Sequence, residues 1–328
     1  MNTAGRLAVF GAGLVVAFGG AYATAGALVP DGALTAWQEG ADMATHVDME
    51  GHADMATHGD RGGHGAQHES GASLPGLSLA QDGYVLAPVQ APANVGDNGV
   101  LRFQILTPTD TPLRDYTASH GKDLHLVVVR TDGYGFRHTH PDFDKATGTW
   151  SVPWQWDAAG SYRVFTDFAP ADAGKMTLSR TFEVAGEFSP VRDPGIRTVA
   201  EVDGYTVRLD GGLVAGVTTS LKVTVTRGGQ PVTSLEPYLG AFGHLVALRD
   251  GDLAYLHVHP AGDEPAADQR GGPAIEFATA APTAGRYLLY LDFKVDGRVH
   301  TATFVVDAAA GDPSQHAGGQ ADEHSGGH

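Results

Sequence analysis

Alternation of apolar and polar residues dominates the chain after about residue 77 and predicts β-strands. Residues 100–106 and 220–226 both place an apolar side chain at every second position, as expected of a strand that buries one face. Such segments are short, rich in Val, Phe, Tyr and Thr, and broken by Gly, Pro and Asp, which is typical of a β-sandwich. No helical periodicity follows residue 30. We therefore expect an all-β fold.

The strand pattern occurs twice. The tripeptide Asp-Gly-Tyr at 82–84 returns at 203–205, and Ala-Gly-x-Tyr at 159–162 returns at 284–287. The second motif resembles the tyrosine corner of immunoglobulin domains. We expect two tandem immunoglobulin-like (cupredoxin/CopC-like) β-sandwiches at residues 77–187 and 199–309, joined by a Pro- and Gly-containing linker at 188–198.

Each repeat also carries three histidines in the pattern H-x12-H-x-H-P. The members are His125, His138 and His140 in the first repeat and His244, His257 and His259 in the second. The segment between the first and second histidine contains Asp-Gly, at 132–133 and 250–251, which predicts a hairpin turn. The three imidazoles of each repeat should therefore lie on two paired strands.

The hairpin register predicts which histidines face each other. The first turn places His125 opposite His140 and diagonal to His138, whereas the second places His244 opposite His257 with His259 diagonal. Cross-strand Cβ atoms are about 4.5–5.5 Å apart, so each triad could surround one metal ion at about 2.0–2.1 Å. The alternative is structural. The same face carries valines and aromatic residues, so the histidines could be buried against the sandwich core and bonded to backbone carbonyls.

A Met/His arm precedes the repeats. Residues 42–65 contain four copies of a six-residue repeat, D-M-x-x-H-x, with Arg in place of Met in the fourth copy. Thioether and imidazole groups together suit copper better than magnesium or calcium. The alternative is a solvated low-complexity linker with incidental histidines. The ligand candidates here are Met43, His46, Met49, His52, Met55, His58, His64 and His68.

The composition excludes some kinds of metal site and argues against some partners. The chain has 16 histidines and no cysteine, which excludes disulfides and a type 1 copper site, because that site requires a thiolate. The net charge of −17 argues against nucleic acid as a partner. Residues 31–76 carry eight acidic residues and one basic residue, which predicts a disordered linker. The tail at 310–328, with three histidines, is either metal-binding or simply disordered.

The N-terminus predicts export. Residues 7–29 contain no charged side chain and follow Arg6. That length can span a bilayer, although Ala-x-Ala motifs also resemble a signal-peptide cleavage site. Residues 1–30 are therefore a signal anchor or a signal peptide. We expect the rest of the chain to lie outside the cytoplasm, at the cell membrane, or secreted if the segment is cleaved.

The two repeats together resemble exported two-domain bacterial proteins associated with heavy-metal handling, and the second repeat resembles the YtkA-like sandwiches. The likeness rests on residues 237–246 and 256–260, and on 168–171 in the first repeat. It implies an extracytoplasmic copper or heavy-metal role and no particular reaction. Sandwiches of the CopC type share the architecture, but this chain lacks their D-x-H pairing.

We therefore expect a non-enzymatic protein that captures, buffers or delivers copper, with zinc as the alternative metal, and that exchanges ions with an envelope protein. His120 and His300 are weaker ligand candidates for the first and second site. Asp167 and Asp292 are structural residues or carboxylate partners of a ligating histidine. The competing functions are a metal-free adhesion or assembly module and, less favoured, a three-histidine metalloenzyme.

Overall fold

The computed structural model describes residues 74–191, 195–256 and 258–311, and this part of the chain is all-β, as expected. The N-terminal segment, the Met/His arm through residue 73 and the tail after residue 311 lie outside the described residues, so the predictions for them stay predictions. Within the described residues, no helix is long and apolar enough to cross a membrane.

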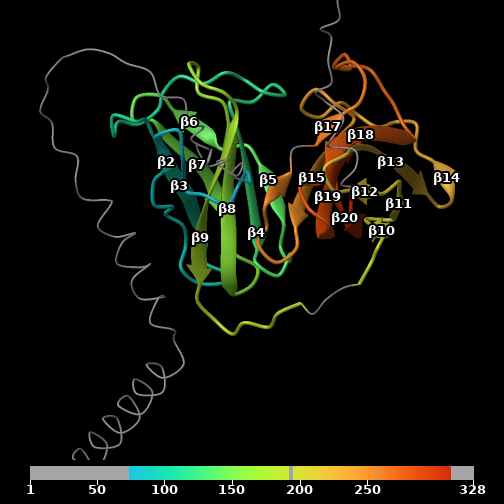
Figure 1. Cartoon of the computed structure of the whole chain (residues 1–328), viewed down its shortest axis with the longest axis horizontal. Helices are drawn as coiled ribbons and strands as arrows, with labels where there is room; N and C mark the ends of the chain where they lie inside the picture. Colours follow the sequence, from blue (N-terminus) through green and yellow to red (C-terminus); the bar gives the residue numbers. More distant parts are fainter. Residues whose placement is uncertain (1–73, 192–194, 257, 312–328) are drawn as a thin grey trace, which may run out of the picture. The chain divides into compact units, whose positions relative to one another are not determined.

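The first repeat is a sandwich of two antiparallel sheets (Figure 1). One sheet has the strand order β1 (Ala80–Gln81), β2 (Tyr84–Leu86), β3 (Gly99–Leu106), β7 (Thr149–Trp154) and β6 (Asp142–Asp144). The other has the order β5 (Arg137–Thr139), β4 (Leu124–Arg130), β8 (Gly160–Phe168) and β9 (Met176–Val184). The chain crosses between the two sheets immediately after β5, so β5 and β6 are successive strands on opposite sheets.

The second repeat is also a sandwich of two sheets, with one parallel pair of strands in the second of them. One sheet has the order β10 (Val199–Val202), β11 (Tyr205–Asp210), β13 (Thr218–Arg227), β18 (Ala274–Ala280) and β17 (His259–Pro260), with β14 (Gln230–Pro231) paired to β13. The other has the order β12 (Leu213–Val214), β20 (Arg298–Ala309), β19 (Gly285–Val295), β15 (Gly243–Arg249) and β16 (Tyr255–Leu256). Strands β15 and β19 thus correspond to β4 and β8.

Both repeats contain the tyrosine corner that the sequence predicted. The Tyr162 hydroxyl donates to the carbonyl of Ala158 at 2.8 Å, and the Tyr287 hydroxyl donates to the carbonyl of Thr283 at 2.8 Å. In each case the acceptor lies four residues upstream of the tyrosine. The two corners support an immunoglobulin-like fold for both sandwiches.

The central strands β4 and β15 are buried on both faces. Along β4, Leu124, Leu126 and Val128 belong to the core of the first sandwich, whereas the alternate residues Val127 and Val129 belong to a separate apolar cluster. That cluster joins the two repeats, because it also contains residues of β15, β16, β19 and β20. We call it the inter-repeat core. Its buried members are Val127, Val129, Phe165, Val246, Leu248, Leu253, Tyr255, Leu288, Tyr290 and Val305.

In the inter-repeat core, two aromatic contacts between the repeats are related by the duplication. Phe136 stacks on Tyr290 with ring centroids 4.0 Å apart, and Tyr255 contacts Phe165 with centroids 5.7 Å apart. Phe136 corresponds to Tyr255 in the duplication, and Phe165 corresponds to Tyr290. The Tyr290 hydroxyl also donates to the carbonyl of Gly133 at 2.8 Å. The repeats therefore contact each other with approximate twofold symmetry.

This arrangement corrects one expectation. The face of β4 that carries His125 is not packed against the core of its own sandwich, as the structural alternative supposed, but against the second repeat. Side chains alternate across a strand, so His125 shares its face with Val127 and Val129. The near-continuous apolar sequence at 124–129 is what a strand buried on both faces requires.

The inter-repeat core predicts a stability effect. Leu248 is fully buried there, so Leu248→Ala should lower the free energy of unfolding by about 2–5 kcal/mol, as in a sandwich core. Val100→Ala, at a 37% exposed position of β3, should change it by less than about 0.5 kcal/mol. Urea unfolding measures both. Equal, small effects would show that the repeats do not pack together in solution.

Candidate metal centre

Three histidines of the first repeat converge at the end of the hairpin formed by β4 and β5. Leu126 lies opposite Thr139 and Val127 opposite His138, which is the predicted register and sets His125 against His140. One ring nitrogen from each of His125, His138 and His140 lies within 4.8 Å of the other two. Among the described residues, this is the group of three side chains with the geometry to hold a metal ion.

A backbone carbonyl orients the His125 ring. Its Nε2 lies 3.0 Å from the carbonyl oxygen of Ser119. A carbonyl can only accept, so Nε2 carries the hydrogen and the Nδ1 lone pair of the neutral ring is free. Nδ1 faces the Nε2 atoms of His138 and His140, each at 3.1 Å. His125 therefore offers Nδ1 as its ligand atom.

A carboxylate orients the His138 ring. Its Nδ1 lies 2.9 Å from Oδ2 of Asp292, so Nδ1 carries a hydrogen and Nε2 points toward the other histidines. Asp292 is in β19 of the second repeat, and its Oδ1 accepts a hydrogen bond from the Thr301 hydroxyl at 2.6 Å. The sequence allows Asp292 to be either a structural residue or the carboxylate partner of a ligating histidine. The structure places it beside a histidine of the other repeat, a contact for which the sequence gives no signal.

The spacing of the nitrogens suits a small transition-metal ion. Ligands about 2.0–2.1 Å from a tetrahedral ion are about 3.3 Å from each other, close to the two separations of 3.1 Å. Facing lone pairs repel, so the gap between them must hold either a proton or a cation. A carboxylate behind a histidine also recurs at metal sites, where it fixes the ring and strengthens the nitrogen as a ligand.

Burial favours the neutral forms of His125 and His140, and neutral imidazole is the state that binds metal. Burial lowers the pKa of His125 to about 4, and positive charge on His138 lowers it further, while the Ser119 carbonyl opposes the shift. Burial also lowers the pKa of His140 to about 2, again with a contribution from His138 and His125. Near pH 7 the rings of His125 and His140 therefore carry no net positive charge that would repel an entering ion.

The second hairpin differs from its predicted register. Ala247 lies opposite Leu256 and Leu248 opposite Tyr255, two residues along from the expected register, while the predicted pairing of His244 with His257 itself lies outside the described residues. The reason for the shifted register is a longer turn. The amide of Arg249 donates to the carbonyl of Ala254, and Leu253 within that turn has φ of 57°. A shift of two residues preserves the face of each side chain.

The second triad is only partly described. His257 lies outside the described residues, and the backbone of His259 pairs with Ala278 in the opposite sheet. Like His125, His244 bonds to backbone carbonyls: its Nε2 lies 2.8 Å from the oxygen of Tyr238 and 3.0 Å from that of Leu239. Burial lowers the pKa of His244 to about 4. A second site of the predicted composition stays a prediction.

His120 and His244 lie beside the first triad. The His120 ring is 6.3 Å from His125 and 5.5 Å from His244 between centroids, and His244 is 6.2 Å from His138. A void of about 40 Å³ separates these rings. His120 thus lies beside the first triad, and its role as a ligand stays a prediction. The first histidines of the two repeats, His125 and His244, lie near each other at the inter-repeat contact, with ring centroids 6.4 Å apart.

His300 faces the second sandwich core, away from His244. Its Nδ1 lies 2.7 Å from Oδ2 of Asp203, and its ring packs against Tyr205 and Phe293. His300 is paired with Phe293, a residue of the second sandwich core. Side chains alternate along β20, so His300 faces that core and its neighbour Thr301 faces the first repeat. His300 thus lies on the face opposite to His244, and its predicted contribution to a second site stays a prediction, because the side chains of His257 and His259 are outside the described residues.

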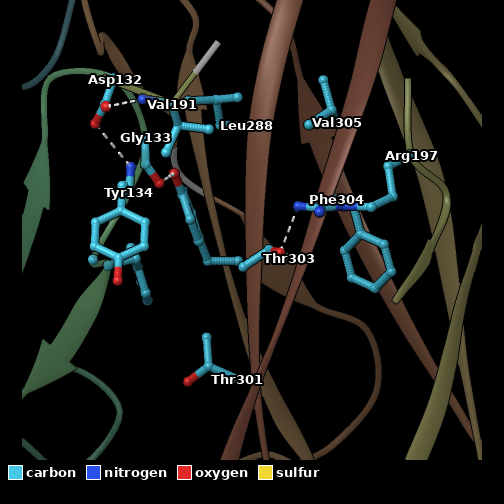
Figure 2. Close-up of a pocket in the computed structure, with 13 residues that line it drawn as sticks. Asp132, Gly133, Tyr134, Val191, Arg197, Leu288, Thr301, Thr303, Phe304 and Val305 are labelled. Carbon is cyan, nitrogen blue, oxygen red and sulfur yellow. Dashed lines mark hydrogen bonds between the residues drawn. The ribbon is translucent and has the colours of Figure 1, made fainter. Parts of the chain in front are cut away.

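A cleft of about 430 Å³ opens next to the inter-repeat core (Figure 2). Several of its polar groups have partners within the chain. Asp132 accepts a hydrogen bond from the amide of Val191 at 2.7 Å, and Arg197 donates to the Thr303 hydroxyl at 2.6 Å. Thr301 also lines this cleft. The cleft therefore reaches the residue that holds Asp292, and it contains no group of the triad.

A comparison with protein families also finds the duplication, because one family matches the chain twice. The chain is a two-repeat, all-β protein with immunoglobulin-like sandwiches. It belongs to the family described as "Domain of unknown function (DUF8832)", which matches residues 79–186 and again residues 200–310. This match gives no support to the resemblance to the YtkA-like group. No curated protein matches the chain.

Several solved structures are distantly similar. They include invasin, a bacterial integrin-binding protein (14% identity, TM-score 0.21), the Escherichia coli adhesin FdeC (17%, 0.22) and domains 5–6 of the S-layer protein SbsC (13%, 0.22). These matches cover 70%, 71% and 69% of this chain, and 39%, 66% and 99% of the respective structures. The chain thus spans well under half of invasin. The low TM-scores carry no argument about function.

The lowered pKa values predict acid sensitivity of the metal-free protein. His125 and His244 have pKa values of about 4 in the folded state and about 6.5 when unfolded. Between these pH values the unfolded chain binds more protons than the folded chain. The contribution of these histidines to the free energy of unfolding is therefore fully present above pH 6.5 and decreases as the pH falls toward 4. At pH 5 the loss is about 2 kcal/mol per histidine.

Urea unfolding of chelator-treated protein at pH 7 and pH 5 measures this loss. His125→Gln should reduce the difference between the two pH values, because glutamine does not titrate. An unchanged difference in this variant would contradict a neutral, buried His125.

Proposed function

We propose that this protein binds copper outside the cytoplasm and captures, buffers or delivers it, with zinc as the alternative ion. One observation carries the proposal: the Nδ1 of His125 and the Nε2 atoms of His138 and His140 converge, each His125 contact measuring 3.1 Å. The Ser119 carbonyl and the Asp292 carboxylate hold two of the rings in the tautomer that a metal ion requires.

The donor set limits the class of ion. Three neutral imidazole nitrogens suit copper or zinc, whereas calcium and magnesium prefer oxygen ligands. The Met/His repeats at 42–65 favour copper over zinc, because thioether is a soft ligand. The proposed role of this arm is to collect ions or pass them to the triad. The uncharged segment at 7–29 supports export of the remainder of the chain.

The surroundings of the triad favour binding over turnover. The two nearby carboxylates are engaged within the described part of the chain. Asp292 accepts hydrogen bonds from His138 and Thr301, and Asp167 lies 3.0 Å from the ammonium group of Lys175. A hydrolytic metal site needs an accessible acid or base beside the ion. We therefore propose a non-enzymatic role, in which an envelope protein donates or receives the ion.

Metal stoichiometry of two full-length variants tests the proposal. Replacing His125, His138 and His140 by alanine should remove one tightly bound copper ion per chain, because no other described group of three offers the same geometry. Replacing the five arm histidines at 46, 52, 58, 64 and 68 by serine should remove weaker sites and leave the tight one. Equilibrium dialysis with copper and zinc in competition measures both affinity and preference.

Circular dichroism and urea unfolding of each variant would show that the sandwiches are still folded. If the triad variant retained the tight ion, the proposed site would be wrong. If the unaltered protein bound no copper or zinc tightly, the sandwiches would instead be candidates for a metal-free adhesion or assembly module.

A further inference from the structure

The residue that orients His138 belongs to the other repeat. We infer that Asp292 and Thr301 are positioning residues for the triad, and that an ion bound by the first repeat couples the two sandwiches. This inference rests on the proposed metal site and extends it. The site is then a joint product of both repeats, with its ligands in one sandwich and its supporting carboxylate in the other.

The carboxylate is well placed for this role. Both oxygens of Asp292 have a partner: Oδ1 accepts from Thr301 and Oδ2 from His138. The side chains of Asp292 and His138 are 4% and 3% exposed, so the contact is shielded from water. Thr301 lies directly across from Asp292 in the pairing of β19 and β20. The rigid sheet therefore fixes the carboxylate before any ion arrives.

The equivalent carboxylate of the first repeat serves a different purpose. Asp167 lies opposite His125 just as Asp292 lies opposite His244. The Thr177 hydroxyl donates to Asp167 at 3.1 Å, which reproduces the contact between Thr301 and Asp292. The second oxygen of Asp167, however, pairs with Lys175. The two Asp–Thr pairs thus share a framework, and Asp292 is the one that contacts a triad histidine.

Electrostatics indicates that metal binding and the packing of the two repeats favour each other. An ion on Nε2 draws electron density from the His138 ring and makes the Nδ1 hydrogen a stronger donor, so the hydrogen bond to the Asp292 anion strengthens. The buried negative charge in turn stabilises the bound cation. Because binding linkage is reciprocal, any factor by which the docked second repeat improves metal affinity is also the factor by which metal favours docking.

Affinity measurements on full-length variants test the positioning role. Asp292→Ala should weaken copper binding by about 10–100-fold, and Thr301→Val should weaken it less. Asp292→Asn should fall between the unaltered protein and Asp292→Ala, because the amide oxygen still accepts from His138 but carries no charge. Thr177→Val is the matched control, since it removes the equivalent hydroxyl from the other Asp–Thr pair. It should leave the affinity unchanged.

The copper(II) electron paramagnetic resonance spectrum provides a readout that a general loss of stability would not produce. Asp292→Ala should retain one bound copper and shift the nitrogen hyperfine pattern, because the His138 ring is no longer held. Thr177→Val should reproduce the spectrum of the unaltered protein. Identical spectra and affinities in Asp292→Ala and the unaltered protein would overturn the positioning role.

Hydrogen exchange tests the coupling itself. Copper should slow amide exchange in β15 and β19 of the second repeat as well as in β4 and β5, and in Asp292→Ala the protection should be confined to the first repeat. If the unaltered protein bound copper and only first-repeat amides were protected, the coupling would be wrong and the proposed function would stand. If no tight copper were bound at all, the proposed function would fail first.

Discussion

The packing of β4 and β8 against β15 and β19 is the interaction on which the rest of the structure depends. A sandwich normally buries one face of each sheet, and here the outer faces are buried as well, through Val127, Val129, Val246 and Leu248. Each fully buried side chain of this kind contributes about 1.5–3 kcal/mol relative to an exposed one. The same burial removes water from His125 and Asp292, which share these faces.

The protonation state of His125 follows from this two-sided burial. A polar ring at the margin of an apolar interface requires partners, and the carbonyl of Ser119 and the nitrogens of His138 and His140 supply them. Desolvation keeps the ring neutral, and the hydrogen bond to the Ser119 carbonyl directs the Nδ1 lone pair at the other two histidines. The interface therefore prepares the chemistry of the triad, and the second repeat completes it through the carboxylate of Asp292.

The two hairpins show when a turn dipeptide predicts the strand register and when it does not. In the first, the Asp-Gly turn predicts the register that places His125 against His140, and the structure confirms it. In the second, the same dipeptide lies in a longer turn that includes Leu253 at positive φ, and the register moves by two residues. A turn dipeptide is a local signal, whereas the turn that forms also places Leu253 in the inter-repeat core, a non-local contact that the dipeptide does not encode.

The sequence by itself determined the all-β class, the duplication, the tyrosine corners and the histidines of the first triad, because each depends on alternation or spacing within a short segment. Only the tertiary structure decided which surface covers those histidines and which residue orients them. Asp292 is 154 positions from His138, and no periodicity connects them. Their contact exists because two sandwiches with apolar outer faces exclude water by packing against each other. The spacing of residues along the sequence does not show which surfaces will pack together.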